Sequence, residues 1–158
     1  NVQLDGTTVT LLDPQASIDL GGIAKGYIAD RLRDYLVSEG CDSALINLGG
    51  NILTVGEKPD GSAFRVGIRK PFSESDKQLE TVVCKDRSVV TSGTYERYFE
   101  QDGKRYHHIL NPADGYPVEN GLASVTILSP ASTDADALST ACFVLGPEKG
   151  LELIETLD

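Results

Sequence analysis

Residues 17–40 read SIDLGGIAKGYIADRLRDYLVSEG, and this stretch predicts the first long helix of the fold. From Ile23 onward its apolar residues recur at spacings of three and four, so they share one helical face; they are Ile23, Tyr27, Ile28, Leu32, Tyr35 and Leu36. Gly40 provides a stop after the last of them. The stretch therefore predicts an amphipathic helix that begins near Ile23, directly after a glycine turn.

The segments that follow this helix, and the one before it, consist of apolar runs separated by turn residues, and these runs predict strands and two more helices. A hairpin is expected over residues 1–12, and strands over 43–50, 51–56, 64–70, 79–85, 88–93 and 123–130. Asp102-Gly103 between two aromatic-rich arms predicts a further hairpin. Residues 133–146 and 147–158 read as closing helices, the second opened by Pro147. This order predicts one α+β domain over residues 1–158, with a mainly antiparallel sheet and packed helices.

Composition excludes several classes of function. The 158 residues carry 14 Lys and Arg against 24 Asp and Glu, a net charge of −10 that argues against binding a nucleic-acid backbone. No apolar run is long enough to cross a bilayer. Cys41, Cys84 and Cys142 are odd in number and widely spaced, which predicts buried free thiols. The absence of methionine predicts a processed or trimmed product.

Two glycine turns are candidates for binding an anion. Asp19 precedes Gly21–Gly22 and Lys25 follows in the first helical turn, where free N–H groups and a lysine suit a phosphate. The spacing is neither a P-loop nor a dinucleotide fingerprint, so an ordinary turn with a surface lysine competes with that interpretation. The turn INLGGN at residues 46–51 is equally open, either a plain turn or backbone that faces a ligand.

Two further segments carry groups suited to proton transfer and metal binding. His107 and His108 are adjacent in a predicted strand, so at most one of them faces a given pocket. Asp134 and Asp136 begin a predicted helix, where acids commonly cap the end. Asp136 also shares a helical face with the two hydroxyl residues that follow it. Such a hard-oxygen set suits Mg²⁺ or Ca²⁺ rather than zinc.

Five motifs taken together resemble the ApbE family. They are IDLGGIAKGYIAD, INLGGN, TSGTYERYF, HHILNPADGYPV and TDADALSTACFVLG, in that order, and they cover residues 17–146. Members of this family are FAD:protein FMN transferases, once called thiamine-biosynthesis lipoproteins. The resemblance implies an ApbE-like, T-fold-related α+β fold. It also implies that the chain lacks the family's N-terminal region, which carries part of the FAD-binding surface.

The resemblance implies a role for each matching residue. Asp19 and Lys25 match residues that contact FAD, and Leu110 matches a flavin-contacting position. His108 matches the histidine proposed to deprotonate the acceptor hydroxyl.

The implied metal ligands come from two of these motifs. Gly22 and Ser139 match positions that give backbone carbonyls to Mg²⁺, and Asp136 and Thr140 match the side-chain ligands. Asp136 is thus implied as the residue that anchors the metal for catalysis.

The reaction implied is transfer of FMN from FAD to a threonine or serine hydroxyl of a partner flavoprotein, such as a redox-pump or reductase subunit, with release of AMP. Two alternatives stay open: a Mg²⁺-dependent FAD pyrophosphatase, and a flavin-binding module without turnover. Relatives mostly act outside the cytoplasmic membrane. We therefore expect an extracytoplasmic protein, anchored through a segment that this chain does not contain, with no membrane insertion by the chain itself.

Overall fold

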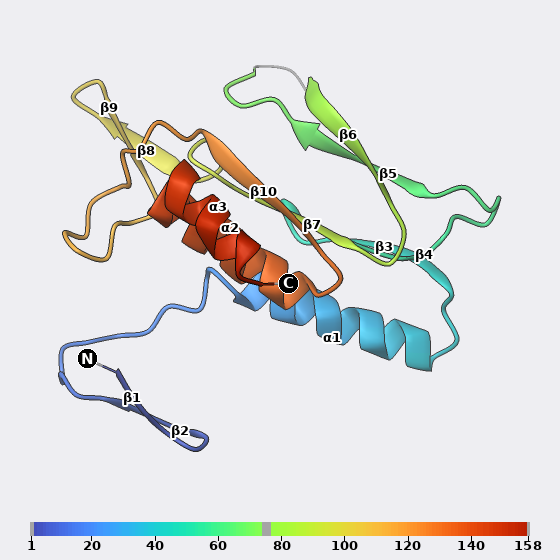
Figure 1. Ribbon diagram of the computed structural model, residues 1–158, viewed down its shortest axis with the longest axis horizontal. Helices are drawn as coiled ribbons and strands as arrows, with labels where there is room; N and C mark the ends of the chain where they lie inside the picture. Colours follow the sequence, from blue (N-terminus) through green and yellow to red (C-terminus); the bar gives the residue numbers. More distant parts are fainter. Residues whose placement is uncertain (1, 74–76, 158) are drawn as a thin grey trace.

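The computed structural model describes residues 2–73 and 77–157 and confirms the α+β class (Figure 1). Asn1, the first residue of the predicted N-terminal hairpin, lies outside the described residues. The helices are α1 (Ala24–Ser38), α2 (Ser132–Leu145) and α3 (Pro147–Glu155). The strands are β1 (Val2–Asp5), β2 (Thr8–Leu11), β3 (Ser43–Asn47), β4 (Asn51–Gly56), β5 (Phe64–Arg69), β6 (Gln78–Cys84), β7 (Ser88–Gly93), β8 (Tyr98–Gln101), β9 (Lys104–His107) and β10 (Ser124–Ser129). No helix among the described residues combines the length and apolar character that crossing a membrane requires.

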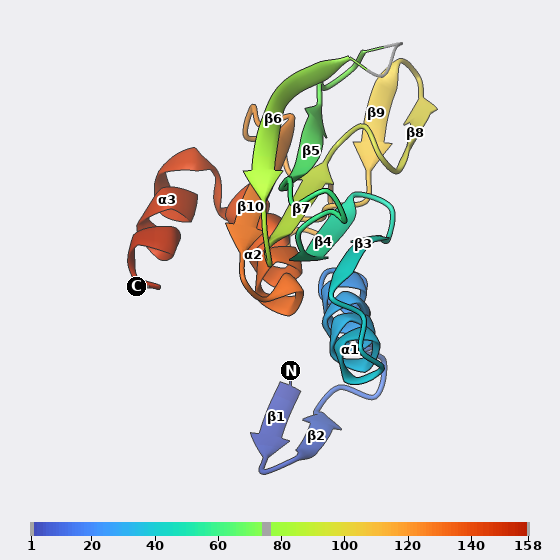
Figure 2. The same ribbon diagram turned by 90° about the vertical axis from the view of Figure 1, so that its right-hand side faces the viewer.

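The central sheet has four strands in the order β10-β7-β4-β3, all paired antiparallel. The hairpins β1–β2, β5–β6 and β8–β9 form separate two-stranded ribbons. Helices α1 and α2 cover one face of the sheet, and ribbon β5–β6 covers the other (Figures 1 and 2). The predicted antiparallel arrangement is therefore confirmed.

Alternating side chains of β4 support both layers of the core. Leu53 points toward the helices, where it packs with Ala29 and Ile46. Its neighbour Ile52 points the other way and packs against a cluster of Val66, Cys84 and Val89 beneath ribbon β5–β6. The three cysteines are free and Cys84 and Cys142 are buried, as predicted, whereas Cys41 is half-buried.

Helix α1 buries its smallest residues rather than its apolar stripe. Gly26 and Ala29 are its buried positions. Most of the predicted apolar face is instead exposed, with Tyr27 at 58% and Tyr35 at 61%. The helix was predicted correctly, but the pattern did not identify its packing surface, because close contact with another helix favours residues without bulky side chains.

Gly26 allows α1 and α2 to cross in direct backbone contact. A Cβ at this position would collide with the carbonyl oxygen of Ser132 and lie 2.7 Å from Cβ of Asp136. The close approach lets the Gly26 amide donate a hydrogen bond of 2.8 Å to Oδ2 of Asp136. Gly26 lies in the first turn of α1, where amides have no partner within the helix. Asp136, which the sequence places near the start of α2, therefore caps the other helix.

Asp30 makes the converse contact, from α1 to the start of α2. Its carboxylate accepts hydrogen bonds from the amides of Ser132 and Thr133 at 2.9 and 2.8 Å, and from the Thr133 hydroxyl at 2.6 Å. Burial alone would raise the pKa of Asp30, but these bonds and the Arg33 guanidinium outweigh it and lower the pKa below its ordinary value. The N-cap residue of α2, Ala131, has no capping side chain, so Asp30 supplies the cap from outside.

We predict that Gly26→Ala destabilises the protein, although alanine favours helices over glycine. The added methyl group has to push α1 away from α2, and an overpacked contact of this kind costs about 1–3 kcal/mol. The free energy of unfolding from urea titration measures the loss. Val37→Ala, at an exposed position of the same helix, is the control and is expected to change stability by less than about 0.5 kcal/mol. Equal stability of Gly26→Ala and wild type would contradict the close crossing.

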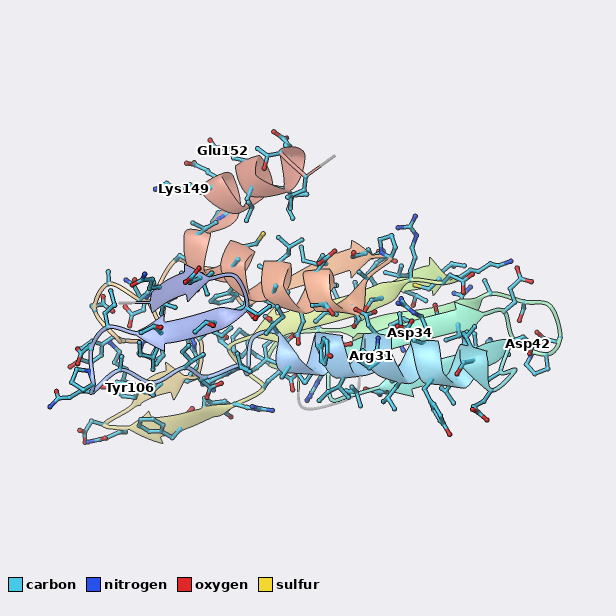
Figure 3. The ribbon with its side chains drawn as sticks, turned by 90° about the horizontal axis from the view of Figure 1, so that it is seen from below. Arg31, Asp34, Asp42, Tyr106, Lys149 and Glu152 are labelled. Atoms are coloured by element: carbon cyan, nitrogen blue, oxygen red, sulfur yellow. The ribbon has the colours of Figure 1, made fainter. Side chains whose placement is uncertain are left out.

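We predict that Asp30→Ala lowers stability by about 1–2 kcal/mol at pH 7, as loss of a helix cap does. Asp34→Ala is the matched control, because Asp34 makes only exposed contacts on α1 (Figure 3). The pKa of Asp30 is depressed, so its stabilising effect is complete above its ordinary value of 3.8 and is lost as the pH falls through the lower folded value. The difference between Asp30→Ala and wild type should thus hold from pH 7 to 5 and shrink under stronger acid. A difference that disappears already at pH 6 would argue against this capping role.

Candidate functional site

One cavity of about 400 Å³ brings together seven of the eight residues singled out in the sequence. They reach it from four parts of the chain: the turn before α1, the start of α1, the segment after β9, and α2. The seven are Asp19, Gly22, Lys25, His108, Leu110, Asp136 and Thr140. Ser139 does not line the cavity and is fully buried behind it.

The turn before α1 forms the first wall. The Gly21 amide donates a 2.6 Å hydrogen bond to Oδ1 of Asp19, which closes a tight turn through the side chain. A Cβ on Gly21 would approach that carboxylate oxygen to 2.7 Å. The side chain of Asp19 therefore shapes the turn as well as lining the cavity.

The INLGGN turn contributes backbone to the same cavity. Gly49 and Gly50 have φ angles of +60° and +86°, a conformation that only glycine adopts readily, and they join β3 to β4. The Gly49 carbonyl accepts a 3.4 Å hydrogen bond from Nζ of Lys25. This contact holds the half-buried lysine at the cavity. Of the two interpretations of INLGGN, the structure favours backbone that faces a site.

The two histidines lie on opposite faces of the chain, as strand geometry predicts. His107 is 8% exposed, and both ring nitrogens are engaged: Nε2 contacts the Val118 carbonyl at 3.1 Å and Nδ1 accepts from the Ile109 amide at 3.3 Å. Burial lowers the pKa of His107, which favours its neutral form. His107 is therefore structural, whereas His108 lines the cavity.

The contact between His108 and the main chain defines which ring nitrogen is available for chemistry. Nδ1 of His108 lies 3.1 Å from the carbonyl oxygen of Arg97. A carbonyl oxygen only accepts hydrogen bonds, so in the neutral ring Nδ1 carries the proton and donates it. Nε2 then holds the lone pair. The geometry suits a general base that acts through Nε2.

The donors around Asp136 fit a hard divalent cation. Asp136 is 2% exposed and accepts from the Gly26 amide, but no cationic side chain among the described residues forms an ion pair with it. The Thr140 hydroxyl lines the cavity one helical turn later, and the backbone of Gly22 lies beside Thr140. One carboxylate, a hydroxyl and nearby carbonyl groups match the oxygen ligands that Mg²⁺ prefers. No cluster of three or more His, Cys, Asp or Glu that could hold a metal occurs within residues 2–73 and 77–157.

Ser139 supports this set from behind. Its hydroxyl lies 2.8 Å from Oγ of Ser92 and donates to the Asp136 carbonyl at 3.0 Å. Ser92 in turn contacts Oγ1 of Thr140 at 3.2 Å. The hydroxyl of Ser139 thus fixes neighbours of the site, and a role for its backbone carbonyl as a ligand stays a prediction.

The cavity contains residues that the sequence did not single out. Arg97 and Glu96 add one charge of each sign, and Ser92 and Val144 line it as well. All but Val144 lie in or beside β7 and the segment that follows it. The TSGTYERYF motif contains Ser92, Glu96 and Arg97, and its position between β7 and β8 was the available signal.

Comparison with known proteins supports the resemblance. The sequence matches the ApbE family over residues 1–158. The chain belongs to the ApbE family. It is 54% identical over 151 residues to a FAD:protein FMN transferase of Klebsiella pneumoniae. The aligned region covers 94% of this chain and 46% of that protein. It is 48% identical over 155 residues to a FAD:protein FMN transferase of Treponema pallidum, covering 93% of this chain and 43% of that one.

Solved structures agree with these sequence relatives. The ApbE protein of Thermotoga maritima has a TM-score of 0.85 at 40% identity, covering 98% of this chain and 50% of its own. The flavin transferase ApbE of Vibrio cholerae also has a TM-score of 0.85, at 36% identity. The match covers 99% of this chain and 49% of the Vibrio cholerae chain. The chain therefore spans about half the length of the relatives it matches.

We predict that Asp136→Asn weakens divalent-cation binding at least about tenfold, a loss of roughly 1.4 kcal/mol. Asparagine keeps an oxygen that can accept from the Gly26 amide, so the helix crossing survives while the charge is removed. Calorimetric titration of the full chain with MgCl₂ in the presence of FAD measures the change. Asp134→Asn, at an exposed position on the same helix, should bind Mg²⁺ like wild type. Unchanged Mg²⁺ affinity in Asp136→Asn would exclude this carboxylate as a ligand.

Proposed function

We propose that this chain carries the catalytic site of a transferase that moves FMN from FAD to a threonine or serine hydroxyl of a partner protein. The hydroxyl oxygen bonds to the phosphorus of the FMN half, and the bond from that phosphorus to the bridging oxygen of the pyrophosphate breaks. AMP leaves with the bridging oxygen, and the hydroxyl proton passes to a base. The names of the relatives support this activity, and the cavity supplies groups for each part of it.

His108 is the proposed base. Its Nε2 takes the hydroxyl proton while Nδ1 stays bonded to the Arg97 carbonyl, and this contact orients the ring. Lys25, held by Gly49, and Arg97 supply positive charge for the phosphate oxygens. Asp19 and Leu110 line the same cavity and are proposed to contact FAD.

Mg²⁺ would be held by Asp136 and Thr140 together with the backbone carbonyls of Gly22 and Ser139. When bound, it supplies positive charge for the pyrophosphate and for the leaving AMP. The chain's own contribution is to fix these donors. The Gly26 amide holds Oδ2 of Asp136, and Ser92 contacts the hydroxyls of Ser139 and Thr140.

The observation that carries the proposal is the meeting of two groups in one cavity. A histidine with a free Nε2 and a buried, unpaired carboxylate come from segments far apart in sequence, and both line it. A site that only bound flavin would not require a base. The expected location outside the cytoplasmic membrane rests on the family resemblance and stays a prediction.

The test incubates the full chain with FAD, Mg²⁺ and a flavin-acceptor domain, and follows flavin fluorescence on the acceptor in a denaturing gel together with AMP release. We expect His108→Gln to slow transfer about 10²–10⁴-fold, the usual contribution of a general base. His107→Gln should lower thermal stability but leave transfer by the folded fraction near the wild-type rate.

The products separate the remaining possibilities. Free FMN and AMP without labelled acceptor would indicate a pyrophosphatase, and intact FAD would indicate binding alone. Wild-type transfer rates in His108→Gln would show that this histidine is not the base.

A further inference from the structure

The hairpin β8–β9 has two chemically different faces. Cross-strand partners lie on the same face, and successive pairs alternate between faces. One face carries Tyr98 opposite His107 and Glu100 opposite Arg105. The buried His107 ring packs on Phe143, and Arg105 lies over the Tyr98 ring at 4.1 Å. On this face His107 and Arg105 contact other parts of the protein, whereas Glu100 and Tyr98 keep exposed surface.

The other face forms a ladder of three pairs that starts at the cavity. Its pairs are Phe99 with Tyr106 and Gln101 with Lys104, preceded by Arg97 with His108, where the His108 amide donates to the Arg97 carbonyl at 3.2 Å. Alternation places all six side chains on one face. We call these six residues the hairpin ladder. Arg97 and His108, its first pair, line the cavity.

The middle of the ladder is an aromatic platform open to solvent. The rings of Phe99 and Tyr106 stack with centroids 5.0 Å apart and planes 8° from parallel. Phe99 is 60% exposed, and Nζ of Lys104 lies 5.7 Å from the centroid of the Tyr106 ring. Figure 3 shows Tyr106 on this hairpin, at the opposite end of the molecule from Asp42. Tyr106 is half-buried, so Phe99 is the exposed ring of the platform, and an exposed aromatic ring stacked on a second one is typical of an interaction surface.

The platform lies close to His108, the residue that the acceptor hydroxyl has to reach. Neighbouring pairs on one face of a strand are separated by about 7 Å, twice the rise per residue. The platform therefore lies one such step beyond His108, away from the other cavity walls. A protein whose hydroxyl reaches Nε2 of His108 meets this ladder where it adjoins the cavity, at Arg97 and His108.

We propose that the hairpin ladder is the docking surface for the acceptor protein, which contacts the Phe99–Tyr106 platform through apolar groups about 7 Å from its reactive hydroxyl. This proposal rests on the proposed function. Beyond its first pair the ladder carries one charged residue, Lys104, and Nζ of Lys104 is paired with the Glu119 carboxylate at 2.8 Å. The surface thus suits an acceptor segment that carries apolar groups beside its reactive hydroxyl.

The test compares the double variant F99S/Y106S with wild type in the full chain. The probe is the flavin-acceptor domain used in the test of the proposed function. We expect the KM for this acceptor to rise at least about tenfold, with kcat at saturating acceptor within about twofold and FAD affinity unchanged. Tyr35→Ser on α1 is the matched control, since Tyr35 is exposed to 61% and lies outside the ladder. It should leave all three quantities unchanged.

Each other outcome is informative about one of the two proposals. Equal KM values in F99S/Y106S and Tyr35→Ser would overturn the docking surface while leaving the transferase intact. A loss of FAD affinity that accounts for the slower transfer would assign the platform to the flavin and would also overturn it. Absence of transfer by wild type, with FAD left intact, would instead refute the proposed function and with it the surface that depends on it.

Discussion

The structure depends on two carboxylates that cap each other's helices. Asp136 on α2 accepts from the Gly26 amide in the first turn of α1, and Asp30 on α1 accepts from the first amides of α2. Neither helix has a capping side chain at its own N-cap. The Gly26 amide of α1 and the Ser132 and Thr133 amides of α2 therefore gain these carboxylate partners only when the two helices are docked, and docking requires the close crossing that Gly26 allows.

This exchange couples the fold to the candidate site. Asp136 is both a cap and the buried carboxylate of the cavity, so the contact that docks the helices also fixes one donor. The bond from the Gly26 amide also holds the start of α1 against Asp136. Lys25 and the glycine turn before α1 therefore lie around the Asp136 carboxylate. Donors fixed by the fold need no reorganisation when a ligand binds, and this is what electrostatic stabilisation of a charged reaction requires.

The sequence was sufficient for the elements but not for the contacts between them. Hairpins, strands and helices follow from local signals, such as Asp102-Gly103 and the spacing of apolar residues in α1, and these were confirmed. The packing face of α1 was not predictable, because the periodic stripe around Tyr27 and Tyr35 is exposed while small residues are buried. Asp30 was missed because it caps a helix 102 residues away. His107 and His108 were separated correctly, since strand alternation is local.

The balance of charge in the cavity supports the divalent cation of the proposed function. Asp19, Glu96 and Asp136 face it against Lys25 and Arg97, so its lining is negative by one formal charge. A pyrophosphate ligand adds more negative charge, and the chain as a whole carries −10. Lys25 and Arg97 together carry fewer charges than the Asp136 carboxylate and the two phosphates of the proposed ligand. The proposed function therefore assigns a divalent cation to the place beside Asp136, where the Thr140 hydroxyl and the backbone of Gly22 also lie.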